Sequence, residues 1–123
     1  MTDEFDADTV TSLREEQEVV IRTEAHPDAA VPIWVVVSGG DVFVRSVRGP
    51  KGRWYRDLAA GSTATLEVKG RRIPVRAVAA TDSDSVTRAS KEYSSKYQSS
   101  PYAASMVRDE VLPTTMQLHR LAG

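Results

Sequence analysis

A continuous apolar run followed by a glycine turn constrains the fold of this 123-residue chain more than any other feature. Residues 33–37 (IWVVV) are all apolar and rich in β-branched side chains, which favours a strand buried on both faces. Residues 38–41 (SGGD) then have the composition of a tight turn, and residues 42–47 alternate in character. Strands joined so closely pair as a hairpin, so the sequence predicts a mainly antiparallel β-protein.

The remaining patterns extend this hairpin into a small barrel. We expect a short helix over residues 9–17, strands near 18–24, 64–68, 72–80 and 114–121, and a connection over 26–31. Two helices are predicted between Ala80 and Pro113, the second of them over residues 101–110. Consecutive antiparallel strands close readily into a barrel. The prediction is therefore one mainly β domain over residues 9–123, with about six strands and two to three helices, after an acidic mobile tail at residues 1–8.

Composition excludes several classes of protein. Apolar residues make up 41% and charged residues 27% of the chain, as in an ordinary soluble domain. A net charge of -1 argues against a dedicated nucleic-acid binder. Cysteine is absent and histidine occurs twice, so we expect neither disulfides nor a metal site. No stretch has membrane-spanning length and the first residues are acidic, so we expect no membrane contact, no secretory signal and a cytoplasmic location.

A basic segment at residues 41–58 predicts an anion site. No acid lies between Val42 and Arg56, although the chain as a whole is balanced in charge. A glycine-rich loop of one charge sign, following a strand, is typical of a seat for an anion. The predicted seat comprises the Ser46 hydroxyl, the backbone amides of Gly49 and Gly52, and the cations of Arg48 and Lys51. The alternative is a solvated hairpin tip, where glycine and lysine are common.

Three more residues of this segment are candidate ligand contacts. Trp54 and Tyr55 offer flat apolar surface beside the anion seat, which suits a planar, phosphorylated cofactor. Trp54 is the better candidate for the core, and the position of Tyr55 is left open. Arg45 faces away from Ser46 along the strand, so we expect it to pair with an acid such as Glu67 or to meet a dimer partner. It is the weakest member of the predicted site.

Other aromatic and polar residues are assigned structural or incidental roles. Trp34 lies in the most apolar strand and is expected in the core or at a dimer interface. Tyr93 and Tyr97 have helical spacing and are expected to pack in the core. Lys96 is expected at the solvated surface. His26 has no carboxylate partner nearby in the sequence and is expected to be incidental.

Several short strings are spread over most of the chain. They are Val31-Pro32-Ile33-Trp34-Val35-Val36, Val44-Arg45-Ser46, Arg48-Gly49, Trp54-Tyr55-Arg56, Lys96-Tyr97, Met106-Val107 and Thr114-Thr115. These strings resemble those of a bacterial family known as domain of unknown function 2255. The resemblance runs from about Leu13 to Leu121 and implies kinship without an assigned reaction.

The middle segment is also similar to FMN-binding split barrels and deazaflavin-dependent nitroreductases. Those proteins carry Ser-x-x-Gly after a strand and then a Trp-Tyr pair with a later Leu, which Ser46, Gly49, Trp54, Tyr55 and Leu58 match. The resemblance implies a split β-barrel that acts as a homodimer, with FMN or a deazaflavin in the dimer groove. The chain departs from the nitroreductases at residues 26–30 (HPDAA), where they have an Arg- and Gly-rich hairpin. It also departs at Asp57, where they favour Asn.

No catalytic motif of a hydrolase, metalloprotease, kinase or dinucleotide-binding enzyme is present. If the protein is an enzyme, we expect a small oxidoreductase in which the cofactor transfers hydride. The alternative is a non-catalytic dimeric barrel that binds another anionic small molecule or has lost its cofactor. A barrel that binds oligonucleotides is the least favoured alternative because the charge is balanced.

Overall fold

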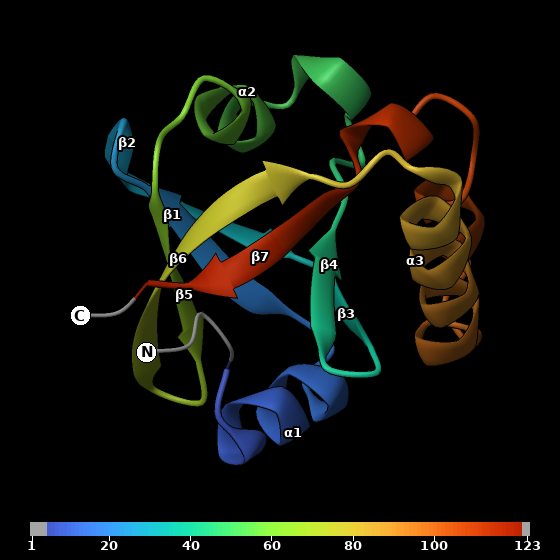
Figure 1. Cartoon of the computed structure of the whole chain (residues 1–123), viewed down its shortest axis with the longest axis horizontal. Coiled ribbons are helices and arrows are strands. Elements are labelled where there is room, and N and C mark those ends of the chain that lie inside the picture. Colours follow the sequence, from blue (N-terminus) through green and yellow to red (C-terminus); the bar gives the residue numbers. More distant parts are fainter. Residues whose placement is uncertain (1–4, 122–123) are drawn as a thin grey trace.

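The computed structural model of the chain describes residues 5–121 and has seven strands in one antiparallel sheet that curls into a half-barrel (Figure 1). The strands are β1 (Val19–Thr23), β2 (His26–Ile33), β3 (Val35–Ser38), β4 (Asp41–Val44), β5 (Ala64–Val68), β6 (Arg71–Ala79) and β7 (Met116–Arg120). Their order across the sheet is β2-β1-β5-β6-β7-β4-β3. The three α-helices are α1 (Ala7–Glu15), α2 (Arg53–Ala59) and α3 (Ser83–Lys96). The predicted mainly β, barrel-like fold is confirmed.

The predicted hairpin forms between β3 and β4. Val37 pairs with Val42 and Ser38 with Asp41, and Gly39 adopts a positive φ of 62° in the turn. Such a φ is strained for any residue with a Cβ, so the turn requires glycine there. Strand β4 ends at Val44, earlier than the alternation indicated, and residues 45–48 leave the sheet.

One strand was missed by the sequence prediction. Residues 26–33 form β2, which pairs with β1 through Val19 and Ile33, whereas a connection was expected over most of this range. Pro27 and Pro32 argued against a strand because proline cannot donate to a ladder. Strand β2 lies at the edge of the sheet, where that donor is not needed.

The helical segments differ from the predictions at their ends. Helix α1 begins at Ala7, two residues earlier than expected, because the Asp6 carboxylate caps it by accepting from the Thr9 amide at 2.7 Å. Residues 1–4 of the predicted mobile tail lie outside the described part of the chain. The helix predicted over residues 101–110 is only a 3-10 turn at Ala103–Met106. None of the helices in residues 5–121 is long and apolar enough to cross a membrane.

The hydrophobic core has two parts, one on each face of the β3–β4 hairpin. Val35 and Val44 point into the half-barrel with Leu13, Ile21 and Leu66. The other face of the hairpin, with Val36 and Phe43, packs against α3 through Ala89, Tyr93 and Tyr97. Figure 1 shows α3 standing beside β3 and β4, outside the half-barrel. The all-apolar run is therefore buried on both faces, as predicted.

Candidate functional site

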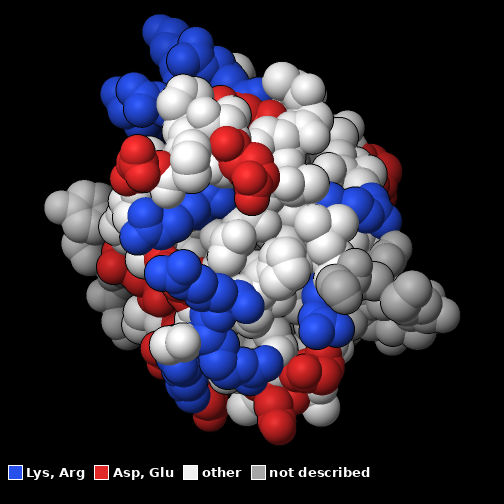
Figure 2. Space-filling view, turned by 90° about the vertical axis from the view of Figure 1, so that its left-hand side faces the viewer, with Lys and Arg blue, Asp and Glu red and all other residues white. Residues whose placement is uncertain are grey.

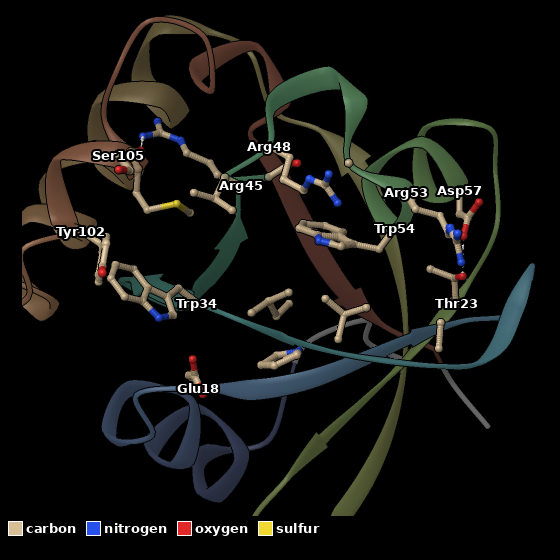
Figure 3. A pocket seen from close by; sticks show the side chains of 18 residues that line it. Glu18, Thr23, Trp34, Arg45, Arg48, Arg53, Trp54, Asp57, Tyr102 and Ser105 are labelled. Carbon is tan, nitrogen blue, oxygen red and sulfur yellow. Dashed lines mark hydrogen bonds between the residues drawn. The ribbon is translucent and has the colours of Figure 1, made fainter.

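A cavity of about 490 Å³ opens between β2, the end of β4 and the segment leading into α2. Figure 3 shows its lining residues in two groups. Trp34 and Tyr102 lie at one end, and Arg53, Asp57 and Thr23 lie at the other. The cavity thus has an aromatic end and an end with charged and hydroxyl groups.

The structure brings five of the eight predicted site residues to this cavity and leaves three outside it. Those that line the cavity are Arg45, Ser46, Arg48, Gly52 and Trp54, and those that do not are Gly49, Lys51 and Tyr55. Residues 49–51 form a 3-10 turn rather than an open loop, and Lys51 is exposed on it. Trp54 and Tyr55 are both half-buried and pack against the core, and Trp54 alone of the two also lines the cavity.

The backbone amides of the basic segment, which were expected to be available to an anion, are already hydrogen-bonded within the chain. The Gly49 amide donates to the Ser46 carbonyl at 2.9 Å, and the Gly52 amide donates to the Gly49 carbonyl at 3.2 Å. The 3-10 turn uses both donors internally. An anion at this place would therefore depend on side chains rather than on a nest of backbone amides.

Arg45 is a buried structural residue, and the expected ion pair with Glu67 does not exist. Its guanidinium donates to the Thr115 hydroxyl at 2.8 Å and to the Ser90 hydroxyl at 2.9 Å. It also donates to the carbonyls of Met106 and Val86, each at 2.9 Å. Burial lowers the pKa of Arg45, which has no acid beside it to compensate. Glu67 instead pairs with Arg22 at 3.2 Å.

Ser46 is the one buried side chain in residues 5–121 whose polar atom lacks a hydrogen-bond partner. It lines the cavity, and its own amide is held by the Thr114 hydroxyl at 3.0 Å. A Cβ on Gly52 would collide with the Ser46 hydroxyl where it stands, so glycine at that position leaves room for the hydroxyl in its present rotamer. A buried hydroxyl without a partner is costly unless a ligand or a water molecule in the cavity completes it.

Arg48 and Arg53 are the exposed cations of the cavity. Both line it, and within the described chain neither has a hydrogen bond or an ion pair. The basic residues of the sheet surface differ in this respect, because several have acid partners. These pairs include Arg22 and Arg72 with Glu67, Lys69 with Glu15, and Arg71 with Asp6. Figure 2 shows one face of the molecule, on which a band of Lys and Arg side chains is interspersed with Asp and Glu.

Trp34 packs against the core, as expected, and it also forms the aromatic end of the cavity. Its ring stacks on Tyr97 with centroids 3.8 Å apart and planes 2° apart. The predicted packing role of Tyr93 and Tyr97 is confirmed, since both are buried. The Tyr93 hydroxyl donates to the Trp34 carbonyl at 2.8 Å. Burial raises the pKa of both tyrosines, which keeps their hydroxyls protonated as donors.

Lys96 is not the solvated surface residue that the sequence indicated. Its ammonium donates to the carbonyls of Leu13 and Val35 at 2.7 and 2.6 Å. Burial lowers the pKa of Lys96 to about 8. The side chain joins α3 to the end of α1 and to β3, and it does not reach the cavity.

A hydrogen-bonded cluster at the charged end of the cavity was missed. The Asp57 Oδ2 atom lies 2.7 Å from His26 Nδ1 and accepts from the Thr23 hydroxyl at 2.7 Å. Burial acts to raise the pKa of Asp57, but these two hydrogen bonds hold it below the ordinary value. His26 therefore has a carboxylate partner after all. The partner lies 31 residues away in the sequence, so no local pattern could have revealed it.

The model of one protein family, described as uncharacterized protein conserved in bacteria (DUF2255), matches residues 9–118. Among solved structures, the chain is similar to the conserved hypothetical protein Rv2991 from Mycobacterium tuberculosis. The TM-score is 0.62 at 11% identity over 99% of this chain and 84% of the other, which shows a shared fold. No curated protein matches the sequence.

Proposed function

This chain belongs to the uncharacterised bacterial family DUF2255, and from its cavity we propose that it binds a planar, phosphorylated cofactor, either FMN or a deazaflavin. One observation carries the proposal. Arg48 and the buried Ser46 hydroxyl are both without partners in the described chain, and both line the cavity that Trp54 also lines. A cation and a hydroxyl would hold the phosphate, while the indole packs against the ring.

The size of the cavity and the placing of its charges support this assignment. A volume of about 490 Å³ is within the range of small-molecule sites. The acids that line it, Glu18 and Asp57, lie towards its margins in Figure 3, whereas Arg48 lies between them. An anionic group is therefore best accommodated at Arg48. The similarity of residues 46–58 to the FMN-binding split barrels adds support by analogy.

A bound flavin would supply hydride transfer, and the protein would then be a small oxidoreductase. The residues of this chain bind the cofactor, orient it and exclude water from it. Trp34 and Trp54 form the apolar wall, and Arg48 fixes the charged tail. No side chain is required to form a covalent intermediate, which agrees with the absence of nucleophile motifs in the sequence.

The proposal includes a homodimer. Tyr102 is 68% exposed and Val47 is 50% exposed, and both line the cavity. Large apolar side chains exposed together mark surfaces that another molecule covers. A second copy seated there would shield the cavity from water. Light scattering on the eluting protein should give twice the chain mass of 13.5 kDa, and a monomer at all concentrations would contradict the dimer.

Titration calorimetry with FMN and with a deazaflavin coenzyme tests the proposal directly, together with an absorbance spectrum of the purified protein. Arg48→Ala should weaken binding by roughly 10- to 100-fold, the cost of a lost charged hydrogen bond. Lys51→Ala is the matched control, because Lys51 is an exposed cation three residues away that does not line the cavity. Wild-type protein that binds neither cofactor would remove the proposal.

One observation favours a second function, in which the barrel is non-catalytic and binds another anionic small molecule. The Gly49 and Gly52 amides are occupied, so the site has fewer donors than phosphate seats commonly provide. An arginine alone suits a carboxylate. Binding of 2-naphthoate that depends on Arg48, with no binding of FMN or the deazaflavin, would establish this alternative. Binding of none of the three would indicate a barrel that has lost its ligand.

A further inference from the structure

Arg53 and Asp57 form an unusual pair at the charged end of the cavity. They lie one turn apart on α2, a spacing at which opposite charges commonly form an ion pair. Both line the cavity, yet within residues 5–121 no ion pair joins them. Figure 3 shows the two side chains at the same end of the cavity, with Thr23 below them. A donor and an acceptor thus lie one helical turn apart without a hydrogen bond between them, although the charge of Arg53 helps to lower the pKa of Asp57.

The Asp57 carboxylate is held in place by Thr23, which also lines the cavity, and by His26, which does not. Its Oδ2 atom accepts from the Thr23 hydroxyl and lies 2.7 Å from the His26 ring nitrogen. Thr23 is itself fixed, because its hydroxyl accepts from the His26 amide at 3.2 Å. The Oδ1 atom has no hydrogen-bond partner in the described chain. The carboxylate therefore has one oxygen engaged and one available as an acceptor.

The charge of this end selects the kind of group that can bind there. Arg53 and the ionised Asp57 together carry no net charge, and Asp57 would repel a phosphate or a carboxylate. A neutral group that accepts one hydrogen bond and donates another satisfies both residues. A cyclic –CO–NH– edge, as in an imide or lactam, presents those two functions next to each other. Arg48, with Ser46, remains available for the anionic part of the same ligand.

We propose that Arg53 and Asp57 recognise the cyclic imide or lactam edge of a planar ligand, with Arg53 donating to its carbonyl and Asp57 Oδ1 accepting from its N–H. This inference rests on the proposed function and sharpens it, because flavins and deazaflavins carry such an edge on their pyrimidine ring. It also fixes the orientation of the ring. The imide edge lies towards α2 and β1, and the opposite edge lies towards Trp34.

Calorimetry with FMN and with its N3-methyl derivative tests the role of Asp57, because the methyl group removes the N–H. Wild-type protein should bind the methylated cofactor roughly 10- to 100-fold more weakly, as expected for a lost hydrogen bond to a charged group. Asp57→Ala should bind the two cofactors with similar affinity. Asp28→Ala changes an exposed acid of β2 that does not line the cavity. It should bind FMN more tightly than the methylated cofactor by the same factor as the wild type.

Two further variants guard against misfolding and test the donor. Asp57→Asn keeps the size of the side chain. It should show a smaller difference in affinity between FMN and the methylated cofactor than the wild type, since a hydrogen bond to a neutral acceptor is about half as strong as one to an ionised acceptor. Arg53→Ala should weaken both cofactors by the same factor, and Arg56→Ala, on the exposed side of α2, should weaken neither.

The outcomes separate this inference from the proposed function. If wild-type protein binds FMN and its methyl derivative equally, the imide inference is wrong and cofactor binding stands. Full discrimination retained in Asp57→Ala or in Asp57→Asn would also overturn the inference. If neither cofactor binds at all, the proposed function fails first and the inference falls with it.

Discussion

Arg45 and Arg48 are three residues apart and both line the cavity, yet the surroundings of their guanidinium groups are opposite in character. Arg45 is buried against α3, and four hydrogen bonds to hydroxyls and carbonyls occupy its guanidinium. Arg48 is exposed at the cavity and has no partner in the described chain. The same contrast extends to hydroxyl groups, because Tyr93 donates to a carbonyl whereas Ser46 has no partner.

The difference teaches how to separate a structural polar group from one that is available to a ligand. Where each donor meets an acceptor, the group holds the fold together and removing it leaves unsatisfied atoms behind. Where a group that lines the cavity has no protein partner, it remains available to a ligand, which would replace the water around it. Composition alone cannot distinguish these cases, since both arginines belong to one basic segment of the sequence.

The largest effect should come from removing the buried arginine. Arg45→Met leaves two hydroxyls and two carbonyls near α3 without their donor, so we expect the free energy of unfolding to fall by about 3–5 kcal/mol. Arg48→Met should change it by less than about 0.5 kcal/mol, as is usual at exposed positions. Urea unfolding of both variants measures the contrast, and equal losses of stability would contradict the distinction between the two arginines.

The close approach of Gly52 to Ser46 should give the next largest effect. Gly52→Ala places a methyl group against the Ser46 hydroxyl and should cost about 1–3 kcal/mol, as overpacking does. The φ of Gly52 is -59°, so backbone strain adds nothing and the cost is steric. Adding Ser46→Ala to Gly52→Ala should restore most of the stability in thermal unfolding. A double variant no more stable than Gly52→Ala would show that the crowding lies elsewhere.

A smaller effect is expected from removing the hydroxyl of a buried tyrosine, Tyr93, compared with that of an exposed tyrosine at the cavity, Tyr102. Tyr93→Phe leaves the Trp34 carbonyl without its donor and should lower the free energy of unfolding by about 0.5–1.5 kcal/mol. Tyr102→Phe is the matched change at the cavity, where the side chain is largely exposed, and it should cost close to nothing. Chemical denaturation compares the two, and a cost at Tyr102 as large as that at Tyr93 would contradict the contrast.

The smallest effect is a pH dependence from Lys96. Burial lowers the pKa of Lys96 in the folded chain to about 8, from the ordinary value of 10.5 for a lysine in an unfolded chain. Between these two values the unfolded chain binds more protons, so the contribution of Lys96 to the free energy of unfolding rises with pH. Below about pH 8 this contribution is constant.

Urea unfolding of wild type and Lys96→Met across this range measures the effect as a difference between the two proteins. The wild type should gain stability relative to the variant as the pH rises from 8 to 10.5. Lys91→Met, an exposed lysine on the same helix, should show no such difference. A relative loss of wild-type stability over this range would mean that the carbonyls of Leu13 and Val35 favour the charged form more than burial disfavours it.

Short sequence patterns predicted the fold well, because a hairpin turn and the helical spacing of apolar residues are each visible within a few residues. The β3–β4 hairpin and the burial of Tyr93 and Tyr97 follow from such patterns. Strand β2 was missed because its prolines are compatible with a strand only at a sheet edge, and edge position is a property of the whole sheet. The alternation placed Arg45 and Ser46 on opposite sides of a strand, but the strand ends at Val44 and both residues line the cavity. Only the Arg45 guanidinium turns towards α3, where it donates to Ser90.

The site was harder to predict because it depends on which groups are already occupied. The sequence indicated that Gly49, Gly52 and Lys51 would face an anion, but a 3-10 turn uses the amides and directs Lys51 away from the cavity. Asp57 and His26 meet only because α2 packs beside the start of β2. Pairings of this kind arise from tertiary packing, which a single sequence does not display.

Trp34 is the single residue between β2 and β3, the two outermost strands of the sheet, and it is stacked on Tyr97 while it lines the cavity. Its indole fluorescence should therefore respond both to a separation of β2 from β3 and to a ligand that occupies the cavity. The chain carries its own optical reporter, and Trp54→Phe would isolate the signal of Trp34 from that of the only other tryptophan.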